Sequence, residues 1–215
     1  MVKVYKFESD TEENCRIKCL EELDVYNNEI LTKEYEEENT YHMEVVKKSD
    51  VEEYINEFLT KTMTLFNNKD YEILYVTGKK DYETIKSNKF PNNVKVVPYI
   101  DKMTRIMKKT DIIVTRAGAS TLSEIIALKV PSIIIPSPYV TNNHQYKNAL
   151  DLVNKNAAIM IEEKDLKSDI IVRNIDKMLQ NRNILENMKN NLEELQVKNS
   201  ATVIYDNIKK LVDGK

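Results

Sequence analysis

The chain has 215 residues, of which 41% are hydrophobic and 31% charged, and its formal net charge is −3 at pH 7. This composition suits one globular core with a small appendage, and no apolar run approaches the ~20 residues of a membrane span or forms a signal peptide. We therefore expect a cytoplasmic protein. Cys15 and Cys19 stand four positions apart without a histidine nearby, which excludes a structural zinc site and predicts reduced cysteines.

The charge is distributed unevenly along the chain. Residues 1–50 hold 14 acidic and 7 basic residues, and the remainder holds 21 acidic and 25 basic. The acidic part is unsuited to nucleic acid, whereas the mildly basic remainder is compatible with an anionic ligand or a membrane surface. The three glycines, Gly78, Gly118 and Gly214, are placed so that GxGxxG, Walker and GxxG motifs are excluded. We expect no direct nucleic acid binding and no metal site.

The N-terminal segment predicts a small βαββ extension over residues 1–46. Residues 2–8 alternate as a strand does, and Thr11 can cap a helix whose first turn carries Glu12 and Glu13. The apolar positions of this helix are Cys15, Ile17, Cys19, Leu20 and Leu23.

The remaining residues, 47–215, predict one Rossmann-like α/β domain. The apolar spacing indicates a helix over residues 51–68, a strand over 72–76 that ends at Thr77 and Gly78, and a strand over 94–97. A loop at 99–101 and a short helix over 102–109 follow. Further on, the pattern predicts a helix over 143–154, a strand over 157–162 and helices up to residue 212, with no glycine or proline to break them.

Residues 111–145 form the central unit of this domain. A β-branched strand at 111–115 leads into a turn of small residues, and Thr121 followed by Glu124 has the spacing of a helix capping box. Pro131 ends the helix before a strand at 132–135. This order predicts a right-handed βαβ crossover in a parallel sheet, so the Gly118 turn and the loop at 137–145 should open onto one cleft at the carboxyl ends of the strands.

The segments TRAGASTLSE, PSIIIPSP and NNHQYKNA, together with YVTGKKDYE and VVPYIDKM, resemble the C-terminal, nucleotide-sugar-binding half of the MurG-type N-acetylglucosaminyltransferases. The resemblance runs from about residue 71 to the C-terminus. It implies the C-terminal half of a GT-B fold and an inverting transfer of GlcNAc from UDP-GlcNAc to a lipid-linked acceptor such as lipid I, in peptidoglycan precursor synthesis. It implies no cofactor or metal, and a possible peripheral location at the inner face of the cell membrane.

The resemblance also implies roles for individual residues, each of which has a plainer alternative. Glu124 would bind ribose or serve the capping box, and Gln145 and the adjacent His144 would recognise the sugar, although His144 could be an ordinary surface residue. The Ile100 backbone would meet uracil, or Ile100 would pack in the core. Arg116 would contact phosphate or form an ion pair. The backbone of Gly118, Ala119, Ser120 and Thr121 would bind the diphosphate or be a plain helix start.

Two features depart from the MurG pattern. Where that family has a GGSxGA loop, MEVVKKSDVEEYINEF places Lys47, Lys48 and Val51 in the glycine positions and retains Ser49, which predicts weaker diphosphate binding. The family's acceptor domain has no counterpart, so we expect donor binding only; either a separate acceptor-binding subunit supplies the other half, or the chain is a degenerate remnant. Residues 1–50 are similar to the N-terminal domain of Jag-type RNA-associated proteins. The alternative function is therefore a non-catalytic nucleotide-sugar-binding or regulatory protein with a Jag-like docking module.

Overall fold

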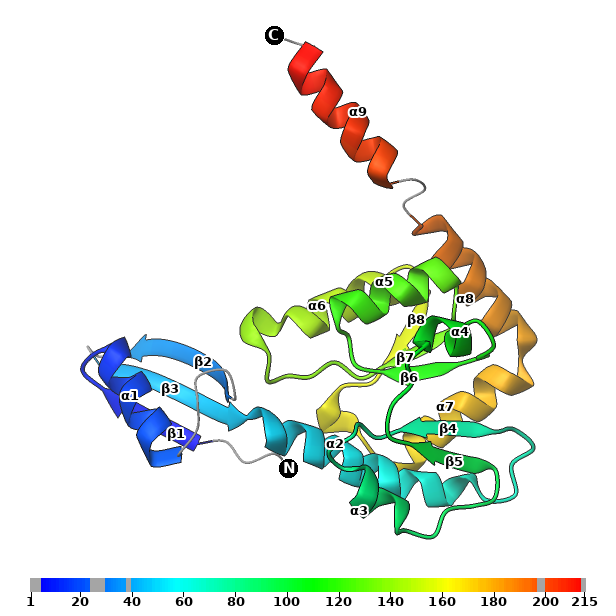
Figure 1. Cartoon of the computed structure of the whole chain (residues 1–215), viewed down its shortest axis with the longest axis horizontal. Helices are drawn as coiled ribbons and strands as arrows, with labels where there is room; N and C mark the ends of the chain where they lie inside the picture. Colours follow the sequence, from blue (N-terminus) through cyan, green and yellow to red (C-terminus); the bar gives the residue numbers. More distant parts are fainter. Residues whose placement is uncertain (1–4, 24–29, 38–39, 197–199, 214–215) are drawn as a thin grey trace.

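The computed structural model describes residues 5–23, 30–37, 40–196 and 200–213. The N-terminal part is a small βαββ unit, seen at the left of Figure 1, with β1 (Tyr5–Ser9), α1 (Glu12–Leu23), β2 (Ile30–Glu37) and β3 (Thr40–Lys47). Its antiparallel sheet has the order β1-β3-β2. This confirms the predicted extension, apart from residues 2–4, which lie outside the described residues.

The core of this unit forms between α1 and the sheet. Cys15 and Cys19 are fully buried beside Phe7 and Met43, because the spacing of the two cysteines puts both on the helix face that covers the sheet. The Thr11 hydroxyl accepts a hydrogen bond from the Asn14 backbone N–H at 3.2 Å, as expected for a cap. Ile17 is 48% exposed, so its predicted place on the apolar face was wrong.

The rest of the chain alternates helices and strands, which confirms the Rossmann-like α/β class. The elements are α2 (Lys48–Met63), β4 (Ile73–Val76), α3 (Tyr82–Lys86), β5 (Val94–Val97), α4 (Met103–Met107), β6 (Ile113–Thr115), α5 (Ala119–Leu128), β7 (Ser132–Ile134), α6 (His144–Val153), β8 (Ala158–Met160), α7 (Ser168–Gln180), α8 (Arg182–Glu194) and α9 (Ser200–Asp213). Short 3-10 turns lie at Thr64–Phe66, Thr141–Asn143 and Glu163–Asp165. The sequence did not predict α3.

The strands of this domain are parallel, and helices cover both of their faces. Successive residues of a strand point to opposite faces, and accordingly Ile133 packs in the core beside α2 and α7, whereas Ile134 packs in the core beside α5 and α6. The described strands form two separate sheets, β4-β5 and β6-β7-β8, rather than one continuous sheet. In Figure 1 the first of these lies below the second.

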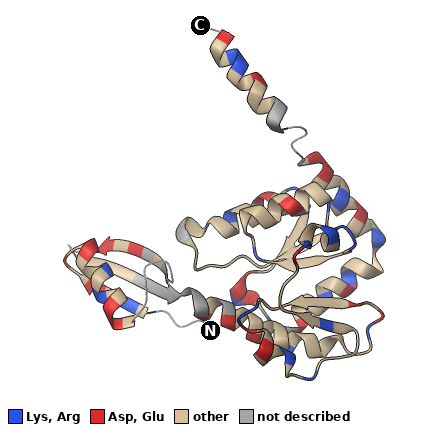
Figure 2. Cartoon of the chain, in the orientation of Figure 1, with Lys and Arg blue, Asp and Glu red and all other residues tan. Residues whose placement is uncertain are grey.

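The junction between the two parts contains no phosphate-binding loop. Strand β3 ends at Lys47 and α2 begins at Lys48, so the segment aligned with the glycine-rich loop is the end of an antiparallel strand joined directly to a helix. Acidic residues are frequent in the N-terminal unit shown at the left of Figure 2.

The last helix, α9, projects away from the domain in Figure 1. Its apolar residues remain exposed, with 59% of Ile204, 63% of Tyr205 and 74% of Leu211 accessible. No described helix is both long enough and apolar enough to cross a bilayer.

Candidate functional site

Helix α5 begins earlier than the sequence pattern predicts, and this removes the capping box. Gly118 is the N-cap, with extended backbone angles (φ −66°, ψ 136°), and no side chain caps the helix. Thr121 is already in the first turn, and Glu124 lies beyond it, so the capping role of Glu124 was wrong. The small residues on either side of Gly118 let the helix start before the threonine is reached. Glu124 is exposed and makes no hydrogen bond or ion pair with any described residue.

The first turn of α5 presents unpaired backbone donors. The earliest helical hydrogen bond runs from the Leu122 N–H to the Gly118 carbonyl, at 3.0 Å. The N–H groups of Ala119, Ser120 and Thr121 therefore have no intrahelical partner, and none of them meets an acceptor in the part of the chain that the structure describes. Such a turn, at the positive end of a helix dipole, favours an anionic group.

Gln145 joins three segments at the carboxyl edge of the sheet. Its Oε1 accepts hydrogen bonds from the Ala117 N–H at 3.3 Å and from the Ser137 N–H at 3.0 Å. These donors belong to the turn after β6 and the loop after β7, and both residues are buried. Nearby, Asn148 Nδ2 donates to the Ala117 carbonyl at 3.4 Å. The start of α6 is thus fastened to the start of α5.

The same contacts fix the direction of the Gln145 amide. Two backbone N–H groups can be satisfied only by the amide oxygen, so Oε1 must face the loops and Nε2 must face away from them. Nε2 has no partner among the described residues, and it is a donor. Gln145 can therefore offer the N–H donors of Nε2 to a ligand while its oxygen holds the loops. The sequence did not reveal this second role.

The loop that brings α6 to this place depends on left-handed asparagines. Asn142 and Asn143 have φ values of 54° and 51°, in a region that asparagine adopts more readily than most residues. Immediately after them His144 begins α6, and it is exposed.

Arg116 forms the ion pair that the sequence left open. Its Nη1 lies 2.5 Å from Glu163 Oε1 and donates to the Ile135 carbonyl at 3.3 Å. The contact with Glu163 is an ion pair rather than a well-directed hydrogen bond, because Glu163 Oε1 has no hydrogen-bond partner of suitable geometry. Arg116 Nη2 also has no hydrogen-bond partner among the described residues. The phosphate contact of Arg116 stays a prediction.

Glu163 is a residue that the sequence analysis missed. It is only 8% exposed and follows β8 at the carboxyl edge of the sheet. Burial raises the pKa of its carboxyl group, and the Arg116 guanidinium opposes this shift. Its position just after a predicted strand was the one available signal, but an acidic residue there is also typical of a solvated loop.

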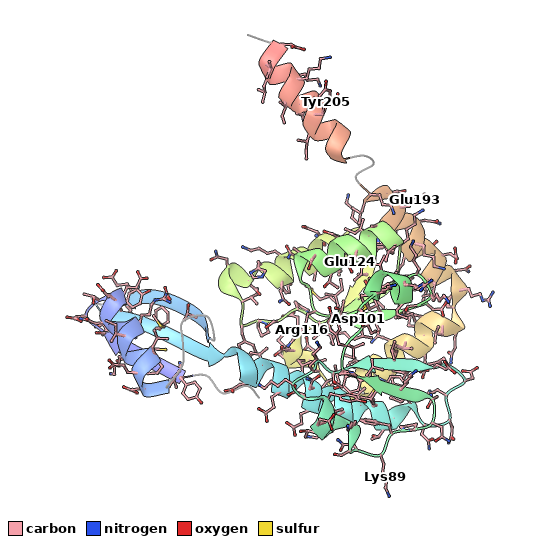
Figure 3. All side chains as sticks on the ribbon, viewed as in Figure 1. Lys89, Asp101, Arg116, Glu124, Glu193 and Tyr205 are labelled. Atoms are coloured by element: carbon pink, nitrogen blue, oxygen red, sulfur yellow. The ribbon has the colours of Figure 1, made fainter. Side chains whose placement is uncertain are left out.

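The loop after β7 packs against the beginning of α2. Tyr139 packs against Val51, as Tyr54 does. Burial raises the pKa of the Tyr139 hydroxyl, with Glu163 adding to the shift and Arg116 opposing it. The first turns of α2 therefore stand beside the ion pair. Figure 3 labels Arg116 in the interior of the view and Glu124 along α5.

Ile100 lies apart from the Gln145 contacts. It follows β5, is half-buried, and lines a cleft of about 930 Å³ between β4 and β6 together with Met103 and Ile106. The structure thus brings Arg116, Gly118 and Gln145 into one contiguous region, with Ala119, Ser120 and Thr121 on the adjoining helix turn.

Residues 49–204 match the glycosyltransferase family 28 C-terminal domain. A UDP-N-acetylglucosamine--N-acetylmuramyl-(pentapeptide) pyrophosphoryl-undecaprenol N-acetylglucosamine transferase of Bacillus thuringiensis is 45% identical over 162 residues, which cover 74% of this chain and 44% of the relative. The transferase of the same description from Bacillus licheniformis is 40% identical over 73% of this chain and 44% of its own length. The chain therefore spans less than half the length of these relatives.

Among solved structures, MurG of Acinetobacter baumannii superimposes with a TM-score of 0.64 at 24% identity, over 74% of this chain and 46% of that one. The spinosyn forosaminyltransferase SpnP superimposes with a TM-score of 0.59 at 18% identity, over 77% of this chain and 40% of that one. These likenesses show a glycosyltransferase fold. Because the family match covers most of the sequence, the chain belongs to the glycosyltransferase family 28 C-terminal domain family.

Proposed function

We propose that this chain binds UDP-GlcNAc and is the donor-binding half of an N-acetylglucosaminyltransferase that acts on a lipid-linked acceptor such as lipid I. In this proposal residues 47–215 are the UDP-sugar domain and residues 1–46 a separate extension. The acceptor half is a second polypeptide, and the assembly works in the cytoplasm at the inner face of the membrane. The names of the relatives support the reaction.

The observation that carries the proposal is the junction made by Gln145. It holds the unpaired N–H groups of the α5 first turn next to an outward-facing amide donor. A nucleotide sugar can use the backbone N–H groups and the amide donor together, because its diphosphate is anionic and its sugar hydroxyls accept hydrogen bonds. The two sets of donors must therefore lie no farther apart than the diphosphate and the sugar of one ligand. As the diphosphate leaves, the same backbone donors would stabilise its growing charge.

The remaining roles follow the same arrangement. Glu124 is exposed, and its carboxylate is available for the two ribose hydroxyls. The backbone beside Ile100 would meet the uracil edge, and His144 would lie near the sugar. Arg116 would act on the phosphates through charge while it stays paired with Glu163.

Titration calorimetry with UDP, ADP and CMP tests the ligand. We expect UDP to bind most tightly, and UDP-GlcNAc to bind more tightly than UDP because of the Gln145 donor. Equal or undetectable binding of all three nucleotides would exclude the assignment. Glu194→Gln, an exposed substitution on α8, is a control that should leave UDP binding unchanged.

A second candidate is a non-catalytic nucleotide-sugar-binding or regulatory protein with the N-terminal unit as a docking module. The direct passage from β3 into α2 favours it, since no glycine loop is present there to hold phosphate. The two candidates differ in turnover. We expect the isolated chain to transfer no labelled GlcNAc to lipid I, because half of a cleft cannot position donor against acceptor. Transfer by the isolated chain would refute the division into two halves, and absence of transfer after addition of an acceptor half would favour the non-catalytic candidate.

A further inference from the structure

Among the described residues, no strand occupies the central position of the parallel sheet. In a doubly wound sheet of this kind the strand order is 3-2-1-4-5-6. Strands β5 and β4 occupy positions 3 and 2, and β6, β7 and β8 occupy positions 4, 5 and 6, but no described strand stands in position 1 between β4 and β6.

The exposure of the neighbouring strands agrees with a missing strand. All three residues of β7 are fully buried, as expected inside a sheet with helices on both faces. In β6 every residue is only half-buried, and in β4 Leu74 is 39% exposed. Both strands therefore behave as sheet edges, although their positions in the order are central.

Each of these edges carries unpaired backbone groups. The N–H groups of Ile73 and Thr77 donate to the carbonyls of Asn93, just before β5, and Val97, at its end. The backbone groups of the alternate residues Leu74 and Val76 therefore point away from β5, into the cleft. On β6, the Ile113 N–H donates to Pro131 and the Thr115 carbonyl accepts from Ile135. The backbone groups of Ile112 and Val114 then point back towards β4. Within the described ranges, the N–H groups of Leu74, Val76, Ile112 and Val114 have no acceptor.

The two edges run in the same direction. Asn56, in the middle of α2, donates to the carbonyl of Thr77 at the carboxyl end of β4. Tyr54, two residues earlier on α2, and Tyr139 both pack against Val51, and Tyr139 lies close enough to Arg116, at the carboxyl end of β6, to feel its charge. Just beyond the other end of α2, Phe66 of the 3-10 turn packs against Tyr71, just before β4. A strand between the edges can therefore pair with both in parallel.

The space between the edges is large and lined mainly by apolar side chains. It is the cleft of about 930 Å³ that also contains Ile100, and helices border it on both faces: α2 and α7 contribute Leu59 and Ile171, and α4 contributes Met103 and Ile106. An occupant must then be apolar on both of its faces, as a buried parallel strand is.

The segment of this chain that precedes α2 is a poor occupant. Topology rules would place the strand before α2 beside β4, and that segment is β3. However, β3 continues into α2 without any connecting residue, and it is already the central strand of its own sheet. Its Glu44 would also bring a charge into an apolar cleft, which is costly.

We propose that the cleft between β4 and β6 binds an extended apolar segment of a partner polypeptide, which adds to both edges as a parallel strand and completes the sheet. Four or five residues suffice, because β4 and β6 are 4 and 3 residues long. Recognition comes from the main-chain groups of both edges, and selectivity comes from the demand for β-branched or other apolar side chains on both faces.

Amide hydrogen exchange followed by NMR, with the synthetic peptide acetyl-KVIVIVK-amide as probe, tests this proposal on the full chain. We expect the peptide to slow exchange at Leu74, Val76, Ile112 and Val114 by about tenfold or more, while Ile134 in the buried strand β7 stays unchanged. The matched probe acetyl-KVIPIVK-amide should not protect these amides, because proline lacks the donor that the edge requires.

A variant pair separates main-chain recognition from side-chain burial. Leu74→Pro removes an N–H that faces the cleft but leaves the donors to β5 intact, and Leu74→Ala keeps that N–H. We expect Leu74→Pro to weaken peptide binding about tenfold and Leu74→Ala to weaken it less, since a backbone hydrogen bond is worth about that factor. If Leu74→Pro fails to fold, the comparison of amide exchange with the two peptides on the unchanged chain still tests the proposal. Equal protection by both peptides, no protection by either, or strong protection in the chain without peptide would overturn the proposal.

Discussion

Replacing Gln145 separates its two roles, because its oxygen and its nitrogen face different partners. Gln145→Ala removes the acceptor of the Ala117 and Ser137 N–H groups, and both residues are buried, at 0% and 4% exposure. A buried donor that loses its partner costs about 1 to 3 kcal/mol. With some water entering the site, we expect Gln145→Ala to lower the free energy of unfolding by about 2 to 4 kcal/mol.

Gln145→Glu has nearly the same shape but a different ligand-facing atom. One carboxylate oxygen still accepts from both backbone N–H groups, so the free energy of unfolding should change by less than about 1 kcal/mol. The outward-facing donor, however, becomes an acceptor. Affinity for UDP-GlcNAc should fall by about 1 kcal/mol, the usual value of a neutral hydrogen bond, while affinity for UDP should change less.

Urea denaturation gives the free energy of unfolding, and calorimetry with UDP-GlcNAc and UDP gives the affinities. An unchanged urea midpoint for Gln145→Ala would show that Gln145 does not hold the two loops together. Unaltered affinities of Gln145→Glu for UDP-GlcNAc and UDP would show that Gln145 Nε2 does not contact the sugar.

The other predictions concern Glu124, Arg116 and α9. Glu124→Gln should weaken UDP binding by about 1 to 3 kcal/mol without changing the melting temperature, since Glu124 is exposed and caps nothing; a lower melting temperature with normal UDP binding would retire the ribose role. Arg116→Met should lower the free energy of unfolding by about 3 kcal/mol at pH 7, because it leaves Glu163 buried without its counter-charge. The pKa of Glu163, already raised by burial, then rises further, so stability is kept at low pH and lost as pH increases through that pKa. The deficit should therefore shrink between pH 7 and pH 5 in urea titrations, and a deficit independent of pH would contradict this account. Removal of residues 200–215 should change the free energy of unfolding by less than about 0.5 kcal/mol, since the apolar side chains of α9 are largely exposed; a larger loss would show that α9 packs on the domain.

Residue patterns alone were enough to predict the fold class and the elements near the site. Local spacing was sufficient for β5 and β7, because a β-branched run between turn residues has few alternatives, and for α1, because the two cysteines and Leu23 repeat at helical intervals. The start of α5 was misplaced because Thr121 and Glu124 have capping-box spacing, and local spacing cannot tell whether a helix has already begun at small residues.

The two pairings that define the site can be seen only in the folded chain. Gln145 meets Ala117 across 28 positions, and Glu163 meets Arg116 across 47, so neither contact is encoded in a local pattern. The gap between β4 and β6 was equally invisible, because strand order depends on which edges pair over long distances, while every strand present has an ordinary sequence. Periodicity reports which face of an element is buried, and only the folded chain shows what covers that face.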